Sequence, residues 1–129
     1  MAITLATASR TAACDAVVDK IDQGAAAGKL KLKSAADVLL CTITLNDPAF
    51  DGAVNGAAAL DVAPALSGTG AAAAGAGTAA TKFDFTDSDD TVIFSGVVGV
   101  GSGEIQLDNN SIAEGQTVNI TGYTHTQPA

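Results

Sequence analysis

A five-residue alternation of lysine and leucine constrains the fold of this chain more than any other feature. It reads Lys29-Leu30-Lys31-Leu32-Lys33. Because successive side chains of a β-strand point to opposite faces, a strand here places both leucines in a core and all three lysines outside. Lysines on a strand also typically protect the exposed edge of a sheet. The pattern therefore predicts a half-buried strand at a sheet edge.

Related patterns along the rest of the chain predict a mainly β fold. Asn46-Asp47-Pro48 favours a turn, and Asp87-Ser88-Asp89-Asp90 separates two alternating segments as the turn of a hairpin does. We expect strands over residues 29–33, 38–45, 57–65, 81–86, 91–98, 104–107 and 117–126, and turns at 99–103 and 108–110. The expected core residues include Phe83, Phe85, Ile93 and Val97. About seven strands at this spacing predict a β-sandwich.

One α-helix is predicted ahead of these strands. Apolar residues recur at helical spacing between Thr7 and Gln23, and Thr7 or Ser9 can cap the start. The recurring apolar residues are Ala13, Cys14, Val17, Val18 and Ile21. Gly24 ends the segment, so we expect an N-terminal helix over residues 8–24 that docks against the sandwich with this face.

The length of the chain predicts a single domain over residues 1–129, made of an N-terminal arm (1–7), the helix (8–24) and the sandwich (29–126). Residues 67–77 consist of Gly, Ala, Ser and Thr alone. Such low complexity predicts a flexible loop, with a strand restarting near Thr78.

Charge is distributed unevenly along the chain. Residues 1–33 hold five basic and three acidic residues, a sum of +2, whereas residues 34–129 hold Lys82 and eleven acidic residues, a sum of −10. The net charge of −8 disfavours binding to nucleic acid, whose phosphates need clustered Lys and Arg. The sequence shows neither a signal-peptide pattern nor an apolar run of membrane-spanning length, so we expect a soluble product without membrane contact.

No constellation of reactive residues predicts an enzyme. His125 and Tyr123 share one face of the last predicted strand, but no nucleophile accompanies them, and a surface strand is the favoured interpretation. Asp87, Asp89 and Asp90 lack the glycine and glutamate positions of a calcium-binding loop, which favours a solvated turn.

The glycines and cysteines also lack a functional context. Residues 99–103 precede a predicted strand, whereas a phosphate-binding loop needs a helix there. Cys14 and Cys41 could pair in an oxidising compartment, but a chain of this length with only two cysteines is not typical of a disulfide scaffold, so we expect free buried thiols. They are also too far apart for a CxxC pair, so we expect no zinc site. We therefore predict no catalytic residue, no cofactor and no metal.

The lysine strand is the strongest candidate for contact with a partner. A positive edge on an otherwise negative domain can be steered to an acidic partner surface, and strand addition would use the same edge. The alternative is a solvated edge strand with no partner.

Short segments follow one another in a distinctive order along nearly the whole chain. They are Ile21-Asp22-Gln23-Gly24, then residues 27–32, 45–50, 82–89, 96–99, 104–109 and 112–123. This succession resembles a family of small structural proteins of tailed bacteriophages and prophages. The chain departs from the family pattern at Ser34-Ala35-Ala36-Asp37, which lacks an aromatic and Gly-Pro-rich turn, and at Phe83, where a Trp-Phe pair is commoner.

The resemblance implies a virion component, made in the cytoplasm of the host bacterium. We expect a capsid decoration (cement) protein on the outer head surface, because many weak contacts add by multivalency and need no catalytic group. Its partners would be the major capsid protein and further copies of itself, as a dimer or trimer. The expected contact residues are Met1, Ala2, Ile3, Thr4 and Leu5 of the arm, with Lys29, Lys31 and Lys33.

Two alternative functions remain open at this point. One is a tail or fibre-associated virion protein. The other is a carbohydrate-binding adhesion module, although sugar binding usually offers exposed aromatic platforms and the chain has no Trp and one Tyr.

Overall fold

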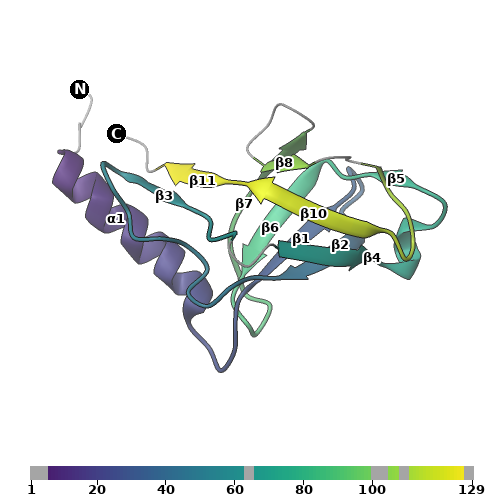
Figure 1. Cartoon of the computed structure of the whole chain (residues 1–129), viewed down its shortest axis with the longest axis horizontal. Helices are drawn as coiled ribbons and strands as arrows, with labels where there is room; N and C mark the ends of the chain where they lie inside the picture. The colour runs from purple at the N-terminus through teal and green to yellow at the C-terminus, as the bar shows by residue number, and fades with distance from the viewer. Residues whose placement is uncertain (1–5, 63–65, 100–104, 108–110, 127–129) are drawn as a thin grey trace.

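The computed structural model describes residues 6–62, 66–99, 105–107 and 111–126, and shows a β-barrel with a helix at one end (Figure 1). The elements in chain order are α1 (Thr7–Asp19), η1 (Lys20–Asp22), β1 (Lys29–Lys33), β2 (Leu39–Thr44), β3 (Ala57–Ala59), β4 (Leu66–Gly70), η2 (Ala72–Ala74), β5 (Thr78–Ala79), β6 (Lys82–Thr86), β7 (Val92–Gly99), β8 (Ile105–Leu107), β9 (Ser111–Ile112), β10 (Thr117–Gly122) and β11 (Thr124–Thr126).

The main sheet closes on itself in the order β1-β2-β4-β10-β8-β7-β6, with β6 pairing back to β1. The pairs are antiparallel except for β7 and β8, which are parallel. This confirms the predicted fold class, mainly β with one N-terminal helix. Opposite walls of the barrel face each other across one core, as the two layers of a sandwich do.

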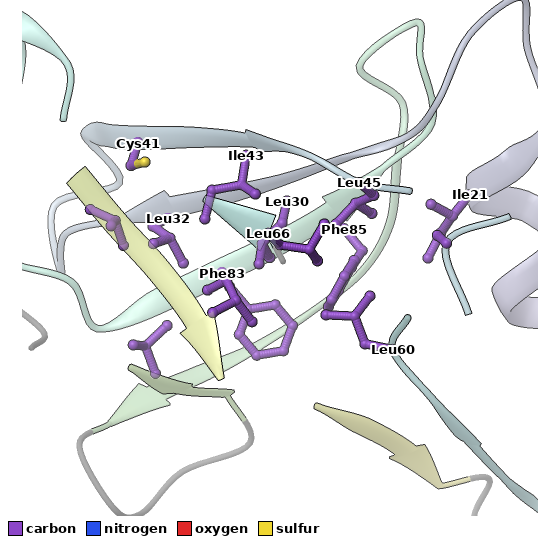
Figure 2. Close-up of a cluster of buried hydrophobic side chains, with 14 of the residues drawn as sticks. Ile21, Leu30, Leu32, Cys41, Ile43, Leu45, Leu60, Leu66, Phe83 and Phe85 are labelled. Atoms are coloured by element: carbon purple, nitrogen blue, oxygen red, sulfur yellow. The ribbon is translucent and has the colours of Figure 1, made fainter. Parts of the chain in front are cut away.

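Inward-facing side chains of the strands fill this core (Figure 2). Leu30 and Leu32 of β1 are fully buried beside Phe83 and Phe85 of β6, as the alternation predicts. The ring centroids of Phe83 and Phe85 lie 5.4 Å apart in an edge-to-face arrangement, which adds to the apolar burial. The aromatic pair therefore lies at the centre of the barrel.

The helix packs on one end of the barrel through the predicted apolar face. Cys14, Val18 and Ile21 are buried, and β3 and β11 form a small antiparallel sheet beside α1 (Figure 1). The predicted side-chain cap is wrong, because the N-cap residue is Ala6 and no side chain caps it. The Thr7 hydroxyl instead accepts a hydrogen bond from the Arg10 guanidinium at 3.2 Å, within the first turn.

Residues 67–77 are not simply a loop, because β4 begins at Leu66 and ends at Gly70 and η2 follows directly. β4 pairs with both β2 and β10 in the barrel. Its glycines are required by close packing. A Cβ at Gly68 would lie 2.7 Å from Cγ1 of Ile43 and from the carbonyl oxygen of Thr42, and one at Gly70 would overlap the carbonyl of Ala113. The first part of this low-complexity segment therefore forms a tightly packed strand.

The predicted core position of Val97 is also wrong, since this side chain is 55% exposed. Phe85 pairs with Phe94 and Thr86 with Val92, which leaves Ile93 as the extra residue of a β-bulge. A shift of one residue exchanges the two faces of a strand. The core therefore receives Val98 from β7, while Phe94 and Ile93 are partly buried against it.

The last predicted strand, residues 117–126, is divided at Tyr123 into β10 and β11. The Tyr123 carbonyl accepts a hydrogen bond from the Leu60 amide at 2.8 Å, so the chain leaves the barrel there and joins the small sheet with β3. The predicted strand over 57–65 is observed only as β3, and residues 63–65 lie outside the described part. The predicted turn at 108–110 lies outside it too, as does that at 99–103 apart from Gly99, the last residue of β7.

Candidate interaction surface

The lysine strand β1 lies inside the barrel wall and is not a sheet edge. It pairs with β2 on one side and with β6 on the other. The alternation correctly predicts which side chains face outward, but it carries no information about neighbouring strands. Strand addition to β1 is therefore excluded, because both of its edges already carry ladder hydrogen bonds.

The three lysines are neutralised by carboxylates of the same chain. Lys29 and Lys31 both contact Oδ1 of Asp90, with Nζ–Oδ1 distances of 3.1 and 3.0 Å. Lys33 pairs with Asp84, which is opposite Lys31 on the neighbouring strand. The basic N-terminal part and the acidic remainder of the sequence thus meet in one wall of the barrel.

The pKa values of both carboxyl groups reflect these contacts. Hydrogen bonds from Lys31 and Lys29 lower the pKa of Asp90 below its ordinary value. Burial opposes ionisation of Asp84, but hydrogen bonds from Lys33 and Ser95 outweigh it, and the pKa of Asp84 is lowered as well. Both groups are therefore charged at neutral pH and hold the lysines to the wall.

The acidic turn between β6 and β7 uses its carboxylates internally. Oδ1 of Asp87 accepts hydrogen bonds from the backbone amides of Asp89 and Thr91 at 2.9 and 3.0 Å. Asp90 has a positive φ of 67° and contacts the lysines. Across the part of the chain that the structure describes, no cluster of three or more His, Cys, Asp or Glu residues could hold a metal ion.

Exposed apolar side chains gather at the Lys33 end of β1. The register places Leu39 opposite Lys33, Lys33 opposite Lys82, and Lys82 opposite Val97. We call these four residues the docking row. Leu39 is 37% and Val97 55% exposed, so apolar side chains flank two lysines on the outside of the barrel. Lys82 also contacts Asp37 at 3.0 Å, with both side chains largely exposed.

A second outward surface covers β2, β4 and β10. It consists of the exposed side chains of Thr42, Thr44, Ser67, Thr69, Thr117 and Asn119, which we call the hydroxyl wall. Thr69 pairs directly with Thr42 and with Thr117, so these three form a row across three strands. Sequence reasoning missed this wall. The signal in the sequence is that the polar residues of each strand are two positions apart, as on one face of a β-strand. It is missed because the residues of β4 are predicted to form a loop.

Tyr123 and His125 are half-buried, so their predicted place on a surface strand is wrong. The Tyr123 ring lies 5.2 Å from that of Phe85, and the His125 ring lies 4.7 Å from that of Phe94. His125 Nε2 is buried without a hydrogen-bond partner among the described residues. Burial lowers the pKa of His125. The pair therefore extends the aromatic core toward the helix.

Cys14 and Cys41 are buried and free, as predicted. Burial raises the pKa of both thiols, and the charge of Asp15 raises that of Cys14 further. Protonated, buried thiols are poor nucleophiles, which fits a structural role in the core.

The arm residues Met1, Ala2, Ile3, Thr4 and Leu5 lie outside the described residues. Of the expected contact residues, the structure therefore places only the three lysines, Lys29, Lys31 and Lys33, on one strand. No helix within the described ranges has the length and apolar character needed to cross a membrane.

Comparison of the chain with protein-family models, with curated proteins and with solved structures found no match.

Proposed function

We propose that this chain is a capsid decoration protein of a tailed bacteriophage or prophage, which binds the outer face of an assembled head. The observation that carries the proposal is the docking row, where exposed apolar side chains flank Lys33 and Lys82 on the outside of a closed barrel. The order of segments that resembles phage structural proteins supports a place in the virion.

The composition of the docking row suits binding to a protein surface. Interfaces that hold proteins together combine apolar contacts with polar or charged residues. Leu39 and Val97 supply the apolar part, and Lys82, whose contact with Asp37 is exposed to solvent, can exchange that partner for an acidic group of the capsid. Because a head presents many identical sites, modest affinity at each site is sufficient.

The contact surface proposed here is narrower than the one expected from sequence. Lys29 and Lys31 are held by Asp90. Lys33 lies in the docking row although it pairs with Asp84. We therefore place the capsid contact at the Lys33 end of β1, and the arm remains a second proposed contact.

The test compares two valines on the same strand. Val97→Asp places a carboxylate in the docking row. Val92→Asp places one outside this row, at the other end of β7, where Val92 is 51% exposed. Each variant is mixed with heads that lack the protein, and bound protein is measured after sedimentation. We expect Val97→Asp to lose binding by about tenfold or more and Val92→Asp to bind normally. Equal binding of both variants would remove the docking row from the proposal.

Copy number tests the decoration role itself. Quantitative mass spectrometry of purified particles is expected to give on the order of hundreds of copies, in simple ratio to the major capsid protein. A few dozen copies or fewer would favour a tail or fibre location, and absence from particles would end the virion proposal.

The carbohydrate-binding alternative receives no support from the arrangement of the aromatic residues. All five aromatic side chains fall within the described ranges and join one cluster. Phe50, Phe83 and Phe85 are buried, and Phe94 and Tyr123 are partly buried against the core. No exposed aromatic platform for a sugar ring is present in these ranges.

A further inference from the structure

The turn between Val54 and Ala57 carries the one Asn-Gly pair of the sequence, Asn55-Gly56. The Val54 amide donates to the Ala57 carbonyl at 2.8 Å and the Ala57 amide to the Val54 carbonyl at 3.1 Å, so two residues close the turn. Both have a positive φ, 52° at Asn55 and 81° at Gly56, which is the conformation that Asn-Gly favours in such turns. The turn leads into β3, and Asn55 is exposed to solvent.

An Asn-Gly pair can modify itself without an enzyme. The Gly56 nitrogen attacks Cγ of Asn55, a succinimide ring closes, and the side-chain nitrogen leaves as ammonia. Water then opens the ring at one of its two carbonyl carbons, which leaves either aspartate or isoaspartate at position 55. Glycine permits the attack because it has no side chain to obstruct the ring. The Gly56 amide must first lose its proton to a base from solvent, so access of solvent to this N–H controls the rate.

Helix α1 covers that N–H. The Gly56 amide donates a hydrogen bond to Oγ1 of Thr11 at 2.9 Å, and the Thr11 hydroxyl donates in turn to the Thr7 carbonyl at 2.9 Å. The hydroxyl proton is thus used within the helix, and a lone pair of the oxygen faces the turn. Gly56 is buried beside Arg10, whose Cβ would lie 3.2 Å from a Cβ at position 56. A base from solvent therefore cannot reach the Gly56 nitrogen while the turn lies against the helix.

A second hydrogen bond holds the same segment to the same side of the helix. Oδ1 of Asp15 accepts a hydrogen bond from the Ala53 amide at 2.8 Å, just before the turn. Residues four apart lie on one side of an α-helix, so Thr11 and Asp15 bind neighbouring amides of one segment. Because Asn55 itself is exposed, protection of the pair depends on the covered Gly56 amide.

We propose that Asn55 is a site of spontaneous deamidation whose rate is set by the hydrogen bond between the Gly56 amide and Thr11. The reaction proceeds in the fraction of molecules whose turn has separated from α1. Isoaspartate places one extra carbon in the main chain, so a two-residue turn can no longer keep both hydrogen bonds between Val54 and Ala57. This inference concerns the free chain and does not rest on the proposed role in the virion.

Peptide mass spectrometry after long incubation at mildly alkaline pH tests the proposal. The wild type should deamidate slowly at Asn55, and Thr11→Val about three- to tenfold faster, because the variant has lost one neutral hydrogen bond. Hydrogen exchange at the Gly56 amide should accelerate by the same factor, since both reactions need the same opening. Asp51-Gly52 can form the same ring, but without a change of mass, so the mass readout reports on Asn55.

Two variants serve as controls. Thr7→Val makes the same substitution one turn earlier on the helix and keeps the Thr7 carbonyl that the Thr11 hydroxyl contacts. Thr11→Ser keeps the hydroxyl that accepts from Gly56. Both variants should deamidate at the wild-type rate.

Three results would overturn the proposal. Thr11→Val could react no faster than the wild type, Thr7→Val could react as fast as Thr11→Val, or Asn55 could stay unmodified in every protein. If Thr11→Val misfolds by circular dichroism, the wild type alone provides the second measurement. Unfolded in concentrated urea, it should deamidate at Asn55 about tenfold or more faster than when native, and equal rates would show that the fold does not protect this site.

Discussion

Asp84 lies on the outer side of β6 and yet is only 9% exposed. Lys33 and the Ser95 hydroxyl both contact its carboxylate, which compensates the cost of burying a charge. The pKa of Asp84 is lowered in the folded protein, so its ionised form stabilises the fold. This stabilisation is complete above the unfolded pKa of about 4 and is lost as pH falls through the lower folded pKa.

Replacing this carboxylate tests that account. Asp84→Asn should reduce the free energy of unfolding by about 1–3 kcal/mol at pH 7, because Lys33 loses its charged partner. The difference from wild type should shrink as pH falls below about 4. Urea unfolding at several pH values measures both effects. Asp89→Asn is the control, since Asp89 is exposed, and a similar loss in that variant would contradict the role of Asp84.

His125 should make stability depend on pH in a different range. Burial lowers its pKa in the folded protein, so the unfolded chain binds a proton more readily. The stabilisation is therefore present above the unfolded pKa of about 6.5 and is lost as pH falls toward the folded pKa. We expect wild-type stability to decline as pH falls below about 6.5, and His125→Gln to show a flatter profile. Parallel profiles in thermal unfolding would contradict this.

Single residues show where sequence reasoning succeeds and where it stops. Leu30, Leu32, Phe83 and Phe85 could be assigned to the core because local alternation fixes their side of the strand. Val97 could not, because the bulge at Ile93 depends on the pairing with β6 and exchanges the faces beyond it. The local alternation predicts which side chains face the core only as long as no bulge shifts the register between the paired strands.

At the scale of elements, β4 depends on glycines that permit close approach. Gly68→Ala should destabilise the protein by about 1–3 kcal/mol, because the new methyl group collides with Ile43 and with the Thr42 carbonyl. Gly52→Ala is the matched control, since nothing lies within 4 Å of a Cβ at that position. Chemical denaturation measures both variants. An equally stable Gly68→Ala protein would show that β4 can shift to accept the methyl group.

The same element explains why the sequence alone gave the wrong interpretation of residues 67–77. Glycine and alanine have low strand propensity, which favours a loop. The neighbours that make β4 a strand are β2 and β10, and β10 lies about fifty residues farther along the chain. The candidate surfaces were hidden for a related reason, since the docking row joins β2, β1, β6 and β7 only through their pairing.

At the scale of the whole molecule, the helix and the barrel share one buried core. Cys14 of α1 and Cys41 of β2 both belong to it, and neither side chain is accessible to solvent. If the chain unfolds as a single cooperative unit, both thiols become reactive only on global unfolding. The rate at which the two thiols react with a reagent therefore tests whether the chain is a single domain.

Thiol labelling checks that prediction. With an excess of a thiol reagent under native conditions, Cys14→Ser and Cys41→Ser proteins should each react slowly, and at the same rate after correction for their stabilities. Mass spectrometry follows the modification. Much faster labelling of Cys14 would mean that the helix detaches from the barrel by local opening, and the single-unit description would then be wrong.

Closure of the barrel has a kinetic consequence. β1 and β2 are neighbours in sequence and can pair early, but β1 also pairs with β6, where Lys29 meets Thr86 and Lys33 meets Lys82. β10 fills the position between β4 and β8, so the ring stays open until residues 117–122 have been synthesised. Formation of such distant pairs slows folding. During synthesis the unclosed sheet presents bare strand edges, and completion of the ring then removes them.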